Sequence, residues 1–327
     1  MGIVRTRIKN SLKRLPYPAL MRLYYAHYSL FYTLPKVYAK HRMGLSTATY
    51  SAMRDRKTSD TVFVLGSGSS INAISEDRWQ AIRRHDSFGF NFWLLHDHVP
   101  TFYTFESPNF DDASGVARKV GETFARAAAQ REQDYRNVFC LLTDLTAERF
   151  PFWHLLPRDF RKRLFTVQTL PVLARSRDEL EASIRFLKAH GLFDQGAVDP
   201  VLKYRGTVSM VVALAAKLGY RNIVLCGIDL SDPAYFYQDP VRYPATVNLW
   251  SHAKAVSPVH PSVVGLPMLR PIDEILVVLQ DMVLAPMGAQ LYVENRSSAL
   301  YPRIPLAPDD LFHDEKLKLQ SDRAPNR

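Results

Sequence analysis

Short apolar runs alternate with longer amphipathic stretches along most of this chain. The runs are rich in β-branched and aromatic residues and predict strands at residues 60–65, 87–92, 101–105, 138–142, 222–226 and 290–293. The stretches between them predict helices at residues 71–84, 113–131, 178–190, 207–218 and 272–283. Strands that alternate with helices are typical of a parallel sheet covered on both faces. We therefore expect an α/β fold with a Rossmann-like, mostly parallel sheet.

Residues 230–270 interrupt this alternation, because they show little periodicity and contain many Pro, Tyr and His residues. A loop of this length inside a compact domain is usually functional, and often forms a lid. The sequence is thus expected to divide into an arm (residues 1–57), a single α/β domain (residues 58–310) that includes this lid, and a polar tail (residues 311–327).

The charge of the chain is concentrated in the arm. The formal net charge is +10, yet residues 1–57 hold 12 of the 42 lysines and arginines and a single acid, Asp55. The remainder is nearly neutral, which is not the distribution of a surface that follows a nucleic-acid backbone. Cys140 and Cys226 are isolated within apolar runs, so we expect buried free thiols in a reducing, cytoplasmic setting.

The arm combines basic residues with interfacial aromatic ones. Arg and Lys alternate with Ile, Val and Leu in residues 1–15, and a segment rich in Leu and Tyr follows at residues 20–32. The arm lacks a secretory signal pattern and is too polar and too interrupted by proline for a spanning helix. Residues 1–44 suit an anionic membrane surface, which would place the protein peripherally on the cytoplasmic face of the inner membrane. The alternative is an arm that packs on its own domain or on a second copy in a homo-oligomer.

A glycine–serine turn, residues 66–70, follows the first predicted strand of the domain. Such a turn can let a phosphate approach backbone N–H groups at a helix N-terminus. It is not a Walker A loop, and it lacks the third glycine and the ribose-binding acid of a dinucleotide fingerprint. Asn91 ends the second predicted strand, where the ligand crevice of an open parallel sheet lies, and its amide can bind a ribose or base or simply close a turn.

Further polar side chains follow the strand at residues 222–226. Asp229 stands at its carboxyl end, and Tyr235 and Tyr237 lie just beyond, where phenols could bind a phosphate or close an aromatic lid. His252 and His260 both fall in the long loop, where a histidine near a nucleotide crevice is the natural general base. The sequence has no metal-binding signature and no nucleophile elbow, so it predicts no metal site and no serine hydrolase.

Four segments occur in a recognisable order, together with the loop that carries His260: VFVLGSGSSI, GFNFW, RGTVSMVVALAAKLGYRNIVLCGIDL and LYVENRSSALYPRIPLAP. Over about residues 60–308 they resemble family 42 of the glycosyltransferases. These are bacterial sialyltransferases that use CMP-sialic acid to extend surface oligosaccharides of lipopolysaccharide or capsule. The resemblance implies a single Rossmann-like, GT-A-like nucleotide-binding domain with a small lid and no cofactor or metal. It also implies inversion at the anomeric centre, with a histidine base deprotonating the acceptor hydroxyl as CMP leaves.

The resemblance places the donor site residue by residue. The family's Gly-Asn-Gly-Pro-Ser loop falls on Gly66, Ser67, Gly68, Ser69 and Ser70, so that Ser67 replaces the asparagine, and its second CMP-binding asparagine falls on Asn91. The Thr-Ser-Gly turn that opens the buried helix falls near Arg205, Gly206 and Thr207, and the Gly-Ile-Asp of the next strand is retained as Gly227, Ile228 and Asp229.

The resemblance also places the catalytic groups. The first of two phosphate-contacting tyrosines is replaced near Ser231, whereas Tyr235 or Tyr237 can supply the second. The catalytic histidine falls on His260, whose distance from Tyr235 along the chain fits the family better than that of His252. The implied partners are a CMP-sugar donor and an oligosaccharide or glycolipid acceptor.

Three other functions stay open at this point. The altered donor loop is compatible with transfer from CMP-Kdo, because sialic acid and Kdo are both 2-keto sugar acids carried on CMP. A pyrophosphokinase of the pterin-kinase type also has a Gly-Ser loop after its first strand, although it would need acidic metal ligands. A non-catalytic nucleotide-binding protein is the third.

Overall fold

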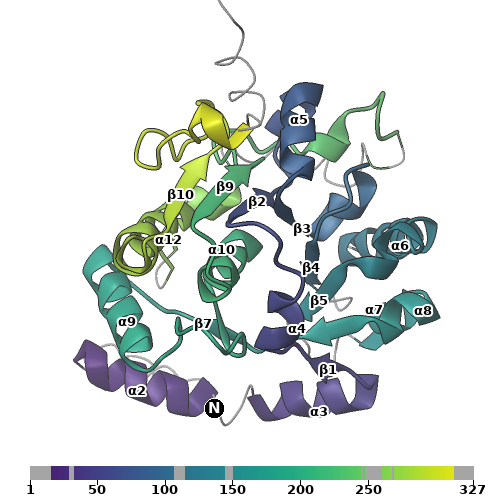
Figure 1. Cartoon of the computed structure of the whole chain (residues 1–327). Helices are drawn as coiled ribbons and strands as arrows, with labels where there is room; N and C mark the ends of the chain where they lie inside the picture. Colours follow the sequence, from purple (N-terminus) through teal and green to yellow (C-terminus); the bar gives the residue numbers. More distant parts are fainter. Residues whose placement is uncertain are drawn as a thin grey trace, which may run out of the picture.

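The structure, a computed structural model, describes residues 16–28, 33–106, 115–143, 150–244, 246, 260–266 and 269–312. Within these ranges eight strands form one sheet in the order β1-β6-β5-β4-β3-β2-β9-β10, and every neighbouring pair is parallel (Figure 1). The strands are β1 (Ser46–Thr47), β2 (Thr61–Leu65), β3 (Asp86–Phe90), β4 (Phe102–Glu106), β5 (Phe139–Thr143), β6 (Leu164–Thr166), β9 (Asn222–Cys226) and β10 (Gln290–Val293). The predicted α/β fold with a Rossmann-like parallel sheet is confirmed.

Helices cover both faces of the sheet, as Figure 1 shows. One core contains the apolar side of α4 (Tyr50–Arg54), α9 (Arg177–Ala189), α10 (Thr207–Lys217) and α12 (Ile272–Leu279). The other core contains that of α5 (Glu76–Arg83), α6 (Val116–Gln130), α7 (Phe150–Leu155) and α8 (Arg158–Lys162). A second sheet of two parallel strands, β7 (Thr169–Pro171) and β8 (Val201–Lys203), leads from β6 to α10.

The central strand β2 shows why these runs become strands. All five of its residues are buried, and its side chains alternate between the two cores, with Val62 and Val64 in one and Phe63 and Leu65 in the other. A strand covered on both faces is apolar at most of its positions, which is the pattern that predicted it. The helix predicted at residues 207–218, α10, is likewise buried along its whole length.

The helix predicted at residues 71–84 is wrong in one respect, because the chain breaks within it. Residues Ser69–Ala73 form a 3-10 turn, η2, and α5 begins only at Glu76. Ile74 is extended, and the Ser75 side chain accepts a hydrogen bond from the Arg78 N–H, so Ser75 caps a new helix. The break orients the Gly-Ser loop and its turn independently of α5.

The described part of the arm packs on the domain. Its helices are α2 (Tyr17–Tyr28) and α3 (Leu34–Met43), and its strand β1 adds to the edge of the main sheet beside β6. The boundary predicted at residue 57 therefore cuts through the folded unit, because residues 46–47 already belong to the sheet. Within the described ranges, no helix combines the length and the hydrophobicity needed to cross a membrane.

The order of the strands creates one switch point, between β2 and β9. From β2 the chain proceeds through β3, β4, β5 and β6 to one side, whereas β9 and β10 lie on the other side. Loops that leave two strands in opposite directions open a crevice at their carboxyl ends, where ligands of open α/β sheets bind. The loops at this place are residues 66–70, after β2, and residues 227–230, after β9.

Candidate active site

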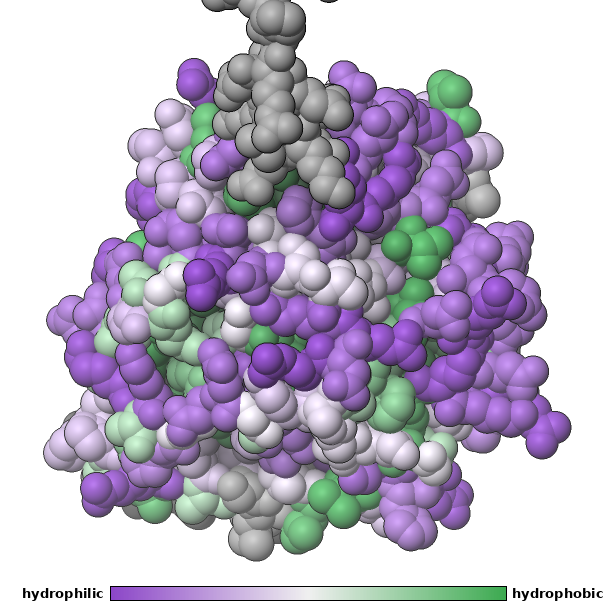
Figure 2. Space-filling model, in the orientation of Figure 1, coloured by the Kyte–Doolittle hydropathy of each residue, from purple (hydrophilic) through white to green (hydrophobic). Residues whose placement is uncertain are grey.

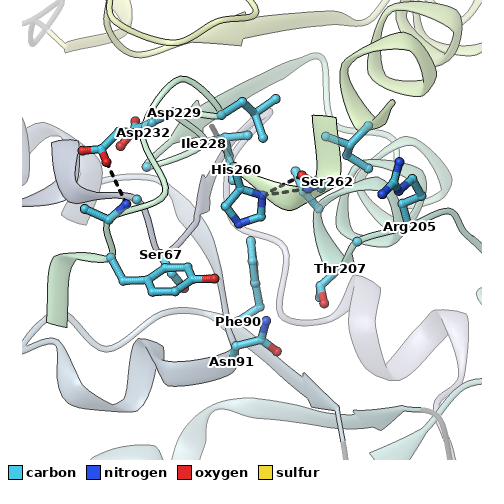
Figure 3. A pocket seen from close by; sticks show the side chains of 18 of the residues that line it. Ser67, Phe90, Asn91, Arg205, Thr207, Ile228, Asp229, Asp232, His260 and Ser262 are labelled. Atoms are coloured by element: carbon cyan, nitrogen blue, oxygen red, sulfur yellow. Dashed lines mark hydrogen bonds between the residues drawn. The ribbon is translucent and has the colours of Figure 1, made fainter. Parts of the chain in front are cut away.

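A pocket of about 260 Å³ lies at this switch point. It is bounded by the carboxyl ends of β2, β3, β4 and β9, by the N-terminus of α10 and by the 3-10 turn η7 (Pro261–Val263) of the predicted lid (Figure 3). Its lining includes Ser67, Gly68, Phe90, Asn91, Glu106, Arg205, Gly206, Thr207, Gly227, Asp229, Leu230, Asp232, Tyr235, His260 and Ser262. Segments far apart in the sequence therefore meet at one place.

The Gly-Ser loop is fastened to the segment after β9 by its own donors. The N–H groups of Gly66 and Gly68 donate to the carbonyls of Cys226 and Gly227, each at 2.8 Å, and the Ser69 N–H donates to the carbonyl of Ala234 at 3.1 Å. The Ser70 N–H and hydroxyl both donate to the Asp229 carboxylate, at 3.0 and 2.5 Å. These donors are satisfied within the protein, so the phosphate cradle predicted for this loop is closed.

Ser67 is the exception in the loop. Its carbonyl accepts a hydrogen bond from the Phe236 N–H at 2.9 Å, while neither its N–H nor its hydroxyl is bonded within the described residues. Ser67 lines the pocket, and Ser69 and Ser70 do not. Of the predicted donor-loop residues, the structure thus leaves Ser67, which stands at the family's asparagine position, as the polar side chain open to a ligand.

Three residues of the pocket have an unusual backbone. Asn91, Arg205 and Leu230 have φ values of 53°, 58° and 59°, and they are the non-glycine residues with positive φ in the described part of the chain. All three line the pocket. Left-handed backbone is costly for residues with a Cβ and tends to accumulate at functional sites. The cluster makes this pocket the candidate functional region of the fold.

Asn91 offers its side chain to the pocket (Figure 3). Its backbone carbonyl accepts a hydrogen bond from the Tyr103 hydroxyl, which fixes the turn after β3. Its side-chain amide has no partner within the described residues. An amide that is positioned by its backbone and left unbonded can donate to and accept from the same ligand.

The sequence analysis missed two features beside the N-terminus of α10: the carboxylate of Glu106 and the backbone N–H groups of the first helical turn. Glu106, the last residue of β4, accepts a hydrogen bond from the Thr207 hydroxyl and forms an ion pair with Lys203 at 2.9 Å. It could have been found by the argument used for Asn91, because it directly follows a predicted strand. The N–H groups of Thr207 and Val208, in the first turn of α10, have no backbone partner among the described residues, so the helix end adds a positive potential beside the Glu106 carboxylate.

His260 stands over the centre of the pocket, at the start of η7 (Figure 3). Its Nδ1 lies 2.7 Å from the Ser262 Oγ and also 3.3 Å from the Ser262 N–H. The ring is thus held through Nδ1, and Nε2 has no partner within the described residues. The Ser262 N–H can only donate, so it makes Nδ1 an acceptor and favours the tautomer with the proton on Nε2. The lone pair of Nε2 is free to accept a proton in the other tautomer, in which Nδ1 donates to the Ser262 hydroxyl.

Burial, and then the nearby Arg205 guanidinium, lower the pKa of His260 below its ordinary value of about 6.5. The imidazole is therefore neutral at pH 7, the state that a general base requires. The Tyr235 ring lies edge-on to the imidazole, with 6.1 Å between their centroids. Burial raises the pKa of Tyr235, so its hydroxyl keeps its proton and can act as a donor.

Arg205 ties the histidine segment to the rest of the site. Its guanidinium donates to the carbonyl of Val264 and, at 3.2 Å, to the carbonyl of Pro261. Pro261 is the first residue of η7 and Val264 directly follows it. Arg205, which lies just after β8, therefore holds the turn that presents His260. The resemblance placed Arg205 at a position where the family has a different turn, and nothing in the sequence indicated this contact across 56 residues.

We expect Arg205→Ala to raise the pKa of His260 toward 6.5. The substitution removes a positive charge that disfavours the imidazolium, and it releases a turn that keeps the ring from water; both effects favour protonation. Proton NMR titration of the histidines measures the change. Arg205→Lys keeps the charge but loses the contact with the two carbonyls. The rise in the His260 pKa that persists in Arg205→Lys is therefore due to loss of the contact, and the further rise in Arg205→Ala is due to loss of the charge. An unchanged pKa of His260 in Arg205→Ala would contradict the described contact.

A second pocket of about 180 Å³, with several aromatic side chains in its lining, adjoins the first. The two share Ser67, Asn91, Glu106 and Tyr235, and the second is otherwise lined by Phe92, Phe105, Val120, Phe124 and Tyr237. Tyr235 and Tyr237 stack with 5.1 Å between ring centroids and 10° between planes, so Tyr235 forms the wall between the two spaces. Tyr237, predicted as an alternative phosphate contact, faces the second pocket and not the His260 pocket.

Most of the predicted site residues come together, with three further departures. Gly66, Ser69 and Ser70 serve the loop and do not line the pocket. Asp229 lines it, but its two carboxylate oxygens are occupied by Ser70. His252, the competitor of His260, and most of the predicted lid lie outside the described residues. Among the residues that the structure does describe, no group of three His, Cys, Asp or Glu side chains is arranged to hold a metal ion.

No protein-family model and no curated protein sequence matches this chain.

Proposed function

We propose that the protein is an inverting glycosyltransferase that moves a 2-keto sugar acid, sialic acid or Kdo, from its CMP ester to a glycan hydroxyl. The observation that carries this proposal is the place of His260: a neutral imidazole with an open Nε2, over a pocket at the switch point of a parallel sheet. The resemblance to family 42 of the glycosyltransferases supports the choice of donor.

The two adjoining pockets suit the two halves of such a donor. The second pocket, lined by Phe92, Phe105 and Phe124, fits a flat pyrimidine base, and Asn91 and Ser67 stand between the pockets, where a ribose would lie. The larger pocket then takes the phosphate and the sugar acid. The first turn of α10, with the unbonded N–H groups of Thr207 and Val208, offers the place for one of their negative charges.

In the proposed reaction the Nε2 of His260 takes the proton of the acceptor hydroxyl as its oxygen bonds to the anomeric carbon. The bond between that carbon and the phosphate oxygen breaks on the opposite face, so the configuration inverts and CMP leaves with the electron pair. The protonated Tyr235 phenol donates a hydrogen bond to the leaving phosphate. The reaction requires the tautomer in which Nδ1 donates to the Ser262 hydroxyl, and that hydroxyl then holds the ring as charge develops on it.

The acceptor is proposed to be an oligosaccharide or glycolipid of the bacterial surface. Such acceptors are built on membrane lipids, so the enzyme would work peripherally at the cytoplasmic face of the inner membrane. The basic composition of residues 1–57 supports this placement.

Nucleotide binding tests the proposal first. CMP should raise the melting temperature of the protein, by mass action, whereas ATP and NAD should not. Asn91→Gly should weaken the binding of CMP by about 1–3 kcal/mol, because it removes a hydrogen-bonding amide. Glycine is the informative replacement, since it adopts the φ of 53° at this position without strain.

Isothermal titration calorimetry measures the CMP affinity, and urea denaturation of the same variant checks the fold. Equal CMP affinity in wild type and Asn91→Gly would remove Asn91 from the site. A protein that binds CMP tightly but neither transfers nor hydrolyses a CMP-sugar would instead be a non-catalytic nucleotide-binding protein.

A further inference from the structure

The surface of α2 and α3 carries an unusual set of exposed apolar side chains. Leu23 on α2 is 52% exposed, and Leu34, Val37 and Tyr38 on α3 are 62%, 53% and 56% exposed. These four are among the ten large apolar side chains that are exposed in the described part of the chain, and they fall on two short helices. Figure 2 shows apolar groups reaching the surface along the lower rim of the molecule, where α2 and α3 lie in Figure 1.

The exposure does not come from loose packing, because both helices are fixed by their opposite sides. On α2, Tyr17 donates to the carbonyl of Leu173 at 2.7 Å, and Tyr25 stacks on Phe186 with 4° between the rings. On α3, Ala39 and Met43 are buried in the core of the domain. The helices thus have a defined inner side, and the exposed residues form a defined outer side.

The outer side of α3 has a regular helical pattern. Leu34, Val37, Tyr38, His41 and Arg42 are exposed, at the i, i+3, i+4, i+7 and i+8 spacing of a single stripe. In an ordinary surface helix that stripe is polar. Here its N-terminal half is apolar and its C-terminal half is basic, so the helix has an apolar face toward the core and another toward the outside.

The formal charge carried by α2 and α3 has one sign. Neither α2 nor α3 contains an aspartate or glutamate, while Arg22 and Arg42 are exposed on them. Residues 1–15, which precede α2 in the sequence, add five lysines and arginines and no acid. In a two-fold dimer each patch contacts the same patch on the other copy. A second copy of this chain on this face would therefore bring like positive charges together, and they would repel each other.

We propose that the outer side of α2 and α3 is a docking face for an anionic lipid bilayer. Leu23, Leu34, Val37 and Tyr38 enter the interface between headgroups and acyl chains, and Arg22 and Arg42 lie at the level of the lipid phosphates. The proposal rests on exposure and charge and does not depend on the reaction proposed above. The sequence alone left open whether the arm binds a membrane or packs on the protein. In this proposal the inner sides of α2 and α3 pack on the domain and their outer sides bind the membrane.

Flotation of the full chain with liposomes tests this face. Vesicles of phosphatidylcholine with about 30% phosphatidylglycerol should carry the protein, pure phosphatidylcholine should carry little of it, and raising the salt concentration should weaken the binding. The variant Leu34→Gln, Val37→Gln, Tyr38→Gln should bind the anionic vesicles at least about tenfold more weakly, since three apolar groups no longer leave water.

The matched control exchanges three apolar side chains exposed elsewhere, Val99→Gln, Leu155→Gln and Val241→Gln, and should bind like wild type. Melting temperatures of both variants show that they are folded. Unchanged flotation of the α3 variant would overturn the proposal. A second result would also overturn it: analytical ultracentrifugation shows the wild type as a dimer and the α3 variant as a monomer, and neither protein binds vesicles. The outer side of α2 and α3 would then contact a second copy of the chain.

Discussion

Replacing His260 with alanine should lower the turnover of CMP-sialic acid by about 10²–10⁴-fold while leaving the affinity for CMP nearly unchanged. The acceptor hydroxyl is a poor nucleophile at neutral pH, and His260 offers the open nitrogen over the pocket that can take its proton. Release of CMP from CMP-sialic acid measures the loss even before the acceptor is known, because water then takes the place of the acceptor hydroxyl. CMP affinity is measured separately by calorimetry.

The pH dependence of the wild type gives an independent check. A general base acts in its deprotonated form, so kcat/KM should be level around pH 7 and fall as the pH drops through the pKa of His260. Because burial and Arg205 lower that pKa, the fall should come below pH 6.5. Arg205→Ala should shift the fall to higher pH.

Two further variants separate the roles around His260. Ser262→Ala removes the partner of Nδ1 and should lower kcat less than His260→Ala, with little change in KM, because Ser262 positions the ring and does not touch the reacting atoms. His252→Ala should have a small effect. If His252→Ala abolishes turnover and His260→Ala does not, the assignment of the base is wrong.

Gly66→Ala should destabilise the protein by about 1–3 kcal/mol and lower the affinity for CMP as well. A Cβ at this position would come within 2.5 Å of the carbonyl oxygen of Gly227 and 2.3 Å of the Ile228 Cδ1. The side-chain atom can move aside, but the carbonyl belongs to the backbone that follows β9. The loops after β2 and β9 would have to separate, which loosens the hydrogen bonds that shape one side of the pocket.

Gly206→Ala is the matched control, because Gly206 lines the same pocket. A Cβ there would meet only the Ile272 Cδ1, at an ordinary 3.7 Å, and the backbone is extended with φ of −149°. The expected loss is less than about 1 kcal/mol, from a poorer N-cap residue of α10. Urea denaturation gives the free energies of unfolding. Equal losses in the two variants would contradict the close approach of the two loops.

The parts of the fold that the sequence predicts well are those whose burial is complete. The strand at residues 61–65 and the helix at residues 207–217 are apolar because they are covered on all sides, so composition alone identifies them. The strands β1, β6, β7 and β8 escaped prediction because each has only two or three residues. A run of that length carries no period, and its pairing is decided by distant partners.

The same distinction applies to the site. Asn91 and His260 could be picked out, one from its place after a strand and the other through the resemblance. The closure of the Gly-Ser loop could not, since its acceptors lie about 160 residues further along the chain. The tether from Arg205 to the turn of His260 is of the same kind, because a guanidinium that binds backbone carbonyls leaves no pattern in the partner's side chains.

The position of β2 between β3 and β9 also has a consequence for the protein during its synthesis. Residue 61 pairs with residue 222, so the ribosome must add 160 residues after Thr61 before the partner strand begins. At about 5–20 residues per second, β2 waits roughly 8–30 s with one edge unpaired. An apolar strand with an open edge is a template for pairing with other chains. A nascent chain paused between β3 and β9 is thus the stage most exposed to aggregation, and slow codons in that interval should lower the yield of folded protein.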